Sequence, residues 1–116
     1  MDNILRVLKP AQVAVDLGCG VGSFHYASYP CRIIGVDVFL NPRSLCRDGS
    51  RIQYLRSKAS ELPLLSGSVD AFICNHTFEH FVDYKRTLAE IHRVLKPHGM
   101  LWIAIPNGHS FDDFLY

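Results

Sequence analysis

A glycine-rich segment, Asp16–Gly22 (DLGCGVG), begins at the end of an apolar run over residues 12–17. Glycine lets the backbone turn sharply and lets a ligand come close to the main chain. An isolated pair of glycines is most often a plain turn. Here the segment follows a predicted strand, and an acidic residue, Asp37, ends the next predicted strand. Together these features favour a loop that binds a nucleotide-like ligand.

The spacing of the glycines narrows the class of ligand. A dinucleotide loop has glycine at its first, third and sixth positions, but the sixth position counted from Gly18 is Ser23. No Gly-Lys-Ser/Thr follows, which excludes a P-loop. The carboxylate of Asp16 suits a positive charge better than a pyrophosphate. A ligand with an ammonium group and no phosphate fits this loop best.

The predicted elements that position these residues alternate between strands and helices. A longer helix is capped by Asp83 and ends before Lys96–Gly99, and a shorter one runs from Asn41 to about Cys46. We also expect a helix after the glycine loop. Short apolar runs predict strands at 12–17, 32–38, 51–55, 69–74 and 100–105. This alternation predicts a doubly wound α/β fold with a parallel sheet.

The composition sets limits on the function. The 116 residues form a single domain, and a net charge of +1 gives no reason to expect nucleic acid or an anionic membrane as partner. No apolar run is long enough to span a bilayer, and the first ten residues lack a signal-peptide pattern. Four cysteines without a CxxC pair argue against a disulfide framework or a metal site. We expect a cytoplasmic protein.

Several segments together carry a resemblance to a known family. DLGCGVG, GVDV, ELPLLSGSVDAFICNHTFEHF and LAEIHRVLKPHGMLWIAIPNG resemble the Rossmann-like, class I S-adenosylmethionine-dependent methyltransferases of the methyltransferase domain 11 type. The resemblance covers about residues 12–107 of a single domain, 1–116. It implies a mostly parallel sheet of strand order 3-2-1-4-5, S-adenosylmethionine as cofactor, and a small-molecule O, N or C acceptor for the methyl group.

The resemblance also implies which residues bind the cofactor. The glycine loop would pack on its methionine part, and Asp16 would help to hold the ammonium end. Asp37 would bind both ribose hydroxyls, and Val38 would pack on the adenine. Asn75 and His76 would lie below the sulfonium. The loop residues concerned are Gly18, Cys19, Gly20 and Gly22.

One position departs from the family pattern. Many relatives have an acid followed by alanine before the Leu-Pro pair, and that acid binds the adenine amino group. This chain has Lys58 and Ala59 there. Lysine cannot accept a hydrogen bond, so we expect the backbone at these two residues to contact the adenine instead.

The segment His76–His80 (HTFEH) also matches H-x-x-E-H, a zinc peptidase motif in which two histidines on a helix bind the metal. It follows directly on a predicted strand, which is the wrong context, so no metal site is expected. Within the methyltransferase interpretation, His76 and His80 are the candidates for a general base. A non-catalytic or truncated domain that binds the cofactor or a partner is the main alternative.

Family members usually continue past the fifth strand with a helix and two more strands. Here only eleven residues follow Ile105, and Ser110 with Asp113 predicts a helix cut off at Tyr116. Strand 100–105 would then be an apolar edge strand. We expect a homodimer through that edge, aggregation, or a missing C-terminal segment that covers it, with weak or absent catalysis by these 116 residues alone.

Overall fold

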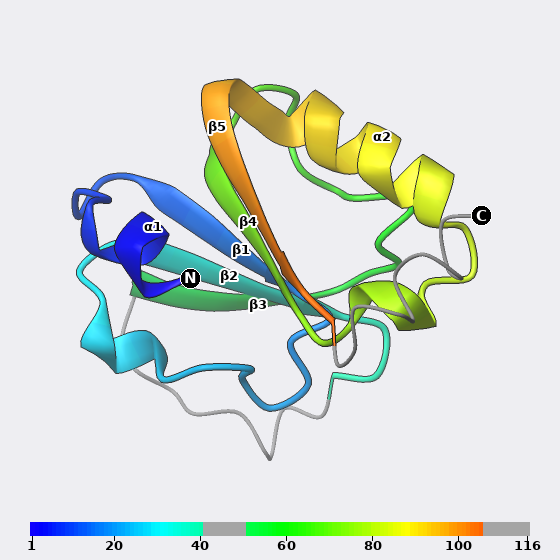
Figure 1. Ribbon diagram of the computed structural model, residues 1–116, viewed down its shortest axis with the longest axis horizontal. Helices are drawn as coiled ribbons and strands as arrows, with labels where there is room; N and C mark the ends of the chain where they lie inside the picture. The colour runs from blue at the N-terminus through cyan, green and yellow to red at the C-terminus, as the bar shows by residue number, and fades with distance from the viewer. Residues whose placement is uncertain (41–50, 106–116) are drawn as a thin grey trace.

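The computed structural model describes residues 1–40 and 51–105, which are built around a five-stranded sheet (Figure 1). The strands lie in the order β3-β2-β1-β4-β5, and each neighbouring pair is parallel. Their bounds are β1 (Val13–Leu17), β2 (Arg32–Asp37), β3 (Ile52–Arg56), β4 (Val69–Asn75) and β5 (Leu95–Ala104). The predicted α/β class and strand order are confirmed. In such sheets ligands bind beyond the carboxyl ends of the strands, where the strand order reverses, here between β1 and β4.

Helical segments cover both faces of the sheet, α1 and η1 on one face and α2 on the other (Figure 1). Their bounds are α1 (Asp2–Arg6), η1 (Tyr26–Ser28), η4 (Phe78–His80) and α2 (Tyr84–Val94). Strand side chains alternate between the faces, so Ala14 belongs to the core under α1 while Val15 and Leu17 belong to the core under α2. Both faces are therefore buried, as the nearly continuous apolar strands predict.

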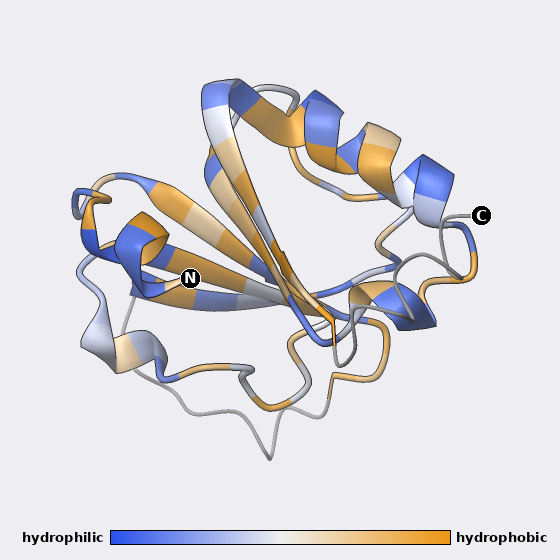
Figure 2. Cartoon of the chain, viewed as in Figure 1, coloured by the Kyte–Doolittle hydropathy of each residue, from blue (hydrophilic) through white to orange (hydrophobic). Residues whose placement is uncertain are grey.

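The helix predicted to begin at Asp83 is present as α2. The carboxylate of Asp83 accepts a hydrogen bond from the backbone N–H of Arg86 at 3.1 Å, which caps the helix. Its apolar stripe faces the sheet and its polar residues face outward (Figure 2). The helix ends at Val94, and β5 begins at Leu95, five residues earlier than the predicted strand. Leu95 pairs with Val69, with a register shift before the regular ladder resumes.

The helix expected after the glycine loop is not formed, which corrects the prediction. The chain makes only a single 3-10 turn, Tyr26–Ser28, before Pro30 and the start of β2. Nine residues separate Gly22 from Arg32, and a helix of that length spans only about 14 Å at 1.5 Å per residue. A strand of six residues is about 20 Å long, so a more extended chain is needed to return along the sheet.

Two predicted elements, the short helix from Asn41 to about Cys46 and the capping box at Ser110 and Asp113, lie outside the described residues. In the parts of the chain that are described, neither helix has the length and apolar character needed to cross a bilayer.

Candidate cofactor site

The loop after β1 has the backbone that its sequence predicts. Gly18, Gly20 and Gly22 all have positive φ angles, of 73°, 55° and 114°. The N–H groups of Gly18 and Cys19 both donate to the carbonyl of Val36, at 2.7 and 3.0 Å, which ties the loop to β2. A Cβ on Gly18 would lie 2.8 Å from the Cβ of Thr77, whereas one on Gly20 would meet nothing within 4 Å. The backbone at Gly20 therefore borders open space that a ligand can enter.

Asp16 lies beneath this loop and is fully buried. Its carboxylate accepts three hydrogen bonds, from the backbone N–H of Ser23 at 3.0 Å, the Ser23 hydroxyl at 2.7 Å and the Tyr26 hydroxyl at 2.5 Å. Burial raises the pKa of Asp16, and these donors act in the opposite direction. Its assignment as a ligand for an ammonium group stays a prediction.

Asp37 ends β2 and lies beside the glycine loop. One carboxylate oxygen accepts from the N–H of Gly20 and the other from the N–H of Phe39, both at 2.9 Å. A carboxylate offers about four lone-pair sites, so two remain for further donors. Val38 follows it with 37% of its surface exposed. This end of β2 thus presents an acceptor next to an accessible apolar side chain.

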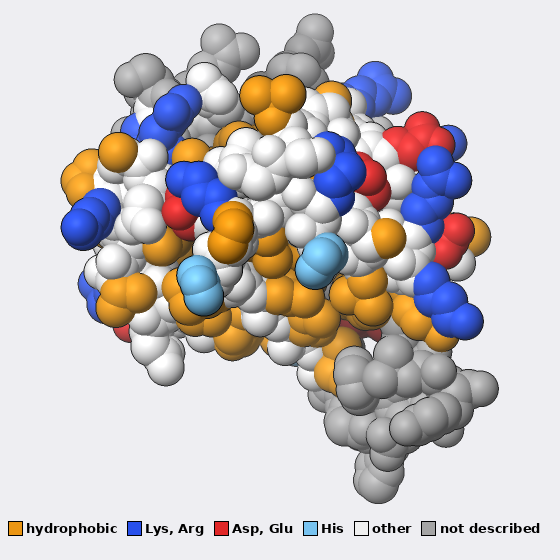
Figure 3. All heavy atoms as spheres, turned by 90° about the horizontal axis from the view of Figure 1, so that it is seen from above, with side chains coloured by type: hydrophobic (Ala, Val, Ile, Leu, Met, Phe, Trp, Pro, Cys, Tyr) orange, Lys and Arg blue, Asp and Glu red, His pale blue; other side chains and the backbone are white. Residues whose placement is uncertain are grey.

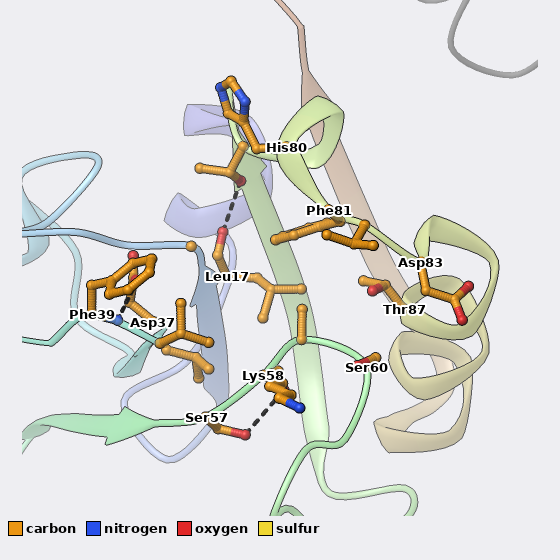
Figure 4. Close-up of a pocket in the computed structure, with 16 residues that line it drawn as sticks. Leu17, Asp37, Phe39, Ser57, Lys58, Ser60, His80, Phe81, Asp83 and Thr87 are labelled. Atoms are coloured by element: carbon orange, nitrogen blue, oxygen red, sulfur yellow. Dashed lines mark hydrogen bonds between the residues drawn. The ribbon is translucent and has the colours of Figure 1, made fainter.

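A cleft of about 640 Å³ opens at the carboxyl edge of the sheet (Figure 4). Side chains from the ends of β1 and β2, from the segment after β3, and from η4 through the start of α2 line it. Of the predicted site residues, it brings together Gly18, Asp37, Val38, Lys58, Ala59 and His80. The ammonium of Lys58 makes no hydrogen bond or ion pair to the described residues, while the Ser57 hydroxyl donates to the Lys58 carbonyl at 3.0 Å. The carboxyl edge of the sheet, where the sequence predicts the cofactor site, therefore contains a cleft.

Other predicted site residues lie around the loop and outside the cleft lining, namely Asp16, Cys19, Gly20, Gly22, Asn75 and His76. The side-chain amide of Asn75 donates to the carbonyl of Ser23 at 3.0 Å, which links the end of β4 to the loop. His76 has a positive φ of 57° and donates its backbone N–H to Ala104. Burial raises the pKa of Cys19 to about 12, so this thiol stays protonated at neutral pH.

Several residues that line the cleft are not predicted from the sequence. Thr77 packs against Gly18 and donates its hydroxyl to the carbonyl of Leu17 at 2.9 Å. Phe81 and Thr87 line the side formed by α2 and the segment before it, and Ser60 lies after β3. Only their place in the chain could have predicted them, because they follow β3 or β4, where parallel strands end.

The structure does not support the zinc motif. The segment from His76 to His80 contains only the single turn η4, so the two histidines do not share the helical face that the motif requires. The Nε2 atom of His80 lies 3.6 Å from a carboxylate oxygen of Glu79. Over residues 1–40 and 51–105, no group of three or more His, Cys, Asp or Glu side chains is placed to hold a metal ion.

Comparison with known proteins decides the family. A family model described as a methyltransferase domain matches residues 15–103. The chain belongs to the methyltransferase domain family. A Mycobacterium tuberculosis relative of this methyltransferase domain, named "Probable S-adenosylmethionine-dependent methyltransferase", is 30% identical over 104 residues, which are 87% of this chain and 38% of that protein. The predicted family and its cofactor, S-adenosylmethionine, are confirmed.

Two further matches bear on the breadth of the family. The mouse tRNA (carboxymethyluridine(34)-5-O)-methyltransferase ALKBH8 is 32% identical over 106 residues, which are 89% of this chain and 16% of that protein. A solved Haloferax volcanii complex of the Trm112 methyltransferase activator with a methyltransferase matches with a TM-score of 0.72 and 28% identity, over 85% of this chain and 47% of that chain. This chain covers less than half the length of each of these proteins.

Proposed function

We propose that this methyltransferase domain binds S-adenosylmethionine at the carboxyl edge of β1, β2 and β4 and transfers its methyl group to a small-molecule acceptor. The observation that carries the proposal is the juxtaposition of an open glycine backbone, the carboxylate of Asp37 and a cleft of about 640 Å³. These lie where the strand order reverses, which is the usual ligand crevice of such sheets.

Asp37 suits the ribose. Each of its oxygens already accepts one backbone N–H and has capacity for one hydroxyl donor. Val38 is accessible for stacking on the adenine, and the backbone of Lys58 and Ala59 borders the same cleft. The adenosine half of the cofactor therefore fits the cleft between the ends of β2 and β3.

The methionine half fits the glycine loop. The open space beside Gly20 leaves the backbone accessible, and Asn75 ties the loop to the end of β4. The sulfonium of the cofactor supplies an activated methyl group, so the protein's contribution is mainly to hold the acceptor in line with it. For an acceptor that must lose a proton, His80 is better placed than His76, because it belongs to the lining of the cleft and His76 does not.

The acceptor class rests on charge. The chain has 12 basic and 11 acidic residues, without the basic excess typical of a tRNA-binding surface. The mouse relative acts on tRNA, so tRNA is the natural competitor for the acceptor role. We expect labelled methyl groups to reach small organic acids, alcohols or amines and not unfractionated tRNA; transfer to tRNA would overturn the small-molecule assignment.

Free, buried Cys19, Cys31 and Cys74 support a cytoplasmic location.

The cofactor assignment is tested by removing the Asp37 carboxylate. We expect Asp37→Ala to weaken binding of S-adenosylhomocysteine by about 1.5–3 kcal/mol, because hydrogen bonds to a charged group are lost. Isothermal titration calorimetry measures the affinity, and circular dichroism checks the fold. Glu61→Ala is the matched control, since it removes an exposed carboxylate outside the cleft lining. Equal affinity in all three proteins would refute the ribose assignment, and no binding to the unmodified chain would refute the proposed function.

A further inference from the structure

A buried polar cluster lies directly beneath the glycine loop. It consists of Asp16, Ser23 and Tyr26, whose three hydrogen bonds all end on the Asp16 carboxylate. Asp16 sits on the central strand, between Gly35 of β2 and Ile73 of β4. Among the described residues no cation forms an ion pair with Asp16, so its charge depends on these donors. Loss of one donor would leave a buried carboxylate poorly compensated.

Ser23 and Tyr26 are each held from a second direction. The carbonyl of Ser23 accepts from the Asn75 side chain at 3.0 Å. The ring of Tyr26 packs edge-on against Phe24 with centroids 4.8 Å apart, and lies 6.2 Å from the ring of Tyr54. Tyr26 is only 6% exposed. Its hydroxyl is therefore a fixed donor, anchored in the core under α1.

The cluster connects this core to the accessible part of the loop. The N–H of Gly22 donates to the carbonyl of Cys19 at 2.8 Å, which closes a turn over Cys19–Gly22, and Ser23 follows this turn directly. Gly20 and Val21 in this turn are exposed, whereas Asp16 below it has no exposed surface. A ligand above the loop would meet its backbone and not the Asp16 side chain.

We infer that Tyr26 and Ser23 are positioning residues which, through Asp16, fix the glycine loop in the shape that binds the methionine end of the cofactor. In this inference Asp16, which has no exposed surface, acts from beneath the loop, in place of the direct contact with the ammonium group that the resemblance implies. This inference rests on the proposed function and adds to it the positioning roles of Tyr26 and Ser23.

The test compares two ligands that share adenine, ribose and sulfur. S-adenosylhomocysteine carries the amino-acid chain, and 5′-methylthioadenosine lacks it. We expect Tyr26→Phe to weaken binding of S-adenosylhomocysteine about tenfold, because a hydrogen bond to a charged group is lost. Its affinity for 5′-methylthioadenosine should stay within about twofold of the unmodified protein. Calorimetric titration of both ligands gives the ratio, which a general loosening of the core would not change.

Two further variants make the outcome decisive. Tyr29→Phe removes a hydroxyl of the same core that donates to Asp2 at 2.7 Å, and it should leave both affinities unchanged. Ser23→Ala removes only the 2.7 Å bond to Asp16 and should repeat the selective loss, which keeps the test valid if Tyr26→Phe fails to fold. An equal loss for both ligands, or no loss, would overturn the inference. If 5′-methylthioadenosine and S-adenosylhomocysteine both fail to bind the unmodified chain, the proposed function fails with it.

Discussion

The glycines of the loop after β1 have different neighbours. Substitutions at single residues can therefore distinguish an effect on folding from an effect on ligand binding. Gly18 is in tight contact with Thr77, while Gly20 borders open space. We expect Gly20→Val to abolish binding of S-adenosylhomocysteine while the chain still folds, because the added side chain fills the space that the ligand needs. Calorimetric titration and circular dichroism on the same sample test both halves of this expectation.

Gly67 provides a matched control for the backbone cost of that substitution. Its φ of 64° is close to the 55° of Gly20, and a Cβ there would also meet nothing within 4 Å. Gly67→Val should therefore lower stability by a similar amount, about 1–2 kcal/mol, and leave ligand binding intact. Retained binding in Gly20→Val would show that the loop is only a turn.

Residue types predicted which side chains gather at the site, but not all of their roles. Asp37, Val38, Lys58 and Ala59 line the cleft because they follow strands that end at one edge. The burial of Asp16 beneath the loop could not be predicted from the residue types. Its partners are the Tyr26 hydroxyl and Ser23, and their approach depends on how the loop folds back over the strand, which no local pattern encodes.

At the scale of elements, α2 is tied to the segment between β3 and β4 by Glu90 and Arg93. Glu90 accepts from the N–H of Leu62 at 2.9 Å and pairs with Arg93, which also donates to the carbonyls of Leu62 and Leu64. The hydrogen bond from Arg93 is the main cause that lowers the pKa of Glu90, from 4.5 to about 2. These contacts fasten the helix to the chain that leads into the central strands.

The pH dependence of this contact follows from the sign of the shift. A carboxyl group whose pKa is lowered by folding stabilises the folded state above pH 4.5, and that contribution declines as the pH falls towards 2. We expect Glu90→Gln to reduce the free energy of unfolding by about 1–2 kcal/mol at pH 7 and by clearly less at pH 3. Urea titrations at both pH values measure this difference. Glu61→Gln, at an exposed pair with Arg86, is the control; an equal effect of Glu90→Gln at the two pH values would contradict the assignment.

Element type was predictable where one periodic pattern decided it, as for the five strands and α2. Boundaries were less predictable. The strand β5 begins at Leu95 because this residue pairs with Val69; Lys96–Gly99, whose residue types favour a helix end, lie in an irregularity before the pairing resumes at Met100. The expected helix after the glycine loop is replaced by the turn η1 because the chain is too short to return as a helix. Both differences come from spatial constraints between strands.

At the scale of the whole molecule, β3 and β5 form the two edges of the sheet over the described residues. Within the described residues β5 pairs only with β4. Hydrophobic side chains gather on the face seen in Figure 3, and Leu101 on this strand is 36% exposed. An apolar edge strand is a template for pairing with another chain. Over residues 1–40 and 51–105, β5 is therefore a candidate edge for association with another chain.

We expect the 116-residue chain to associate with itself through β5 as its concentration rises. Leu101→Lys should shift it towards the monomer, because a charged side chain on an edge strand opposes strand pairing. Sedimentation velocity over a range of concentrations measures the shift. Leu65→Lys is the matched control, since Leu65 is 82% exposed but lies outside the sheet, between β3 and β4. A chain that stays monomeric at every concentration, or an equal effect of both substitutions, would show that β5 does not mediate association.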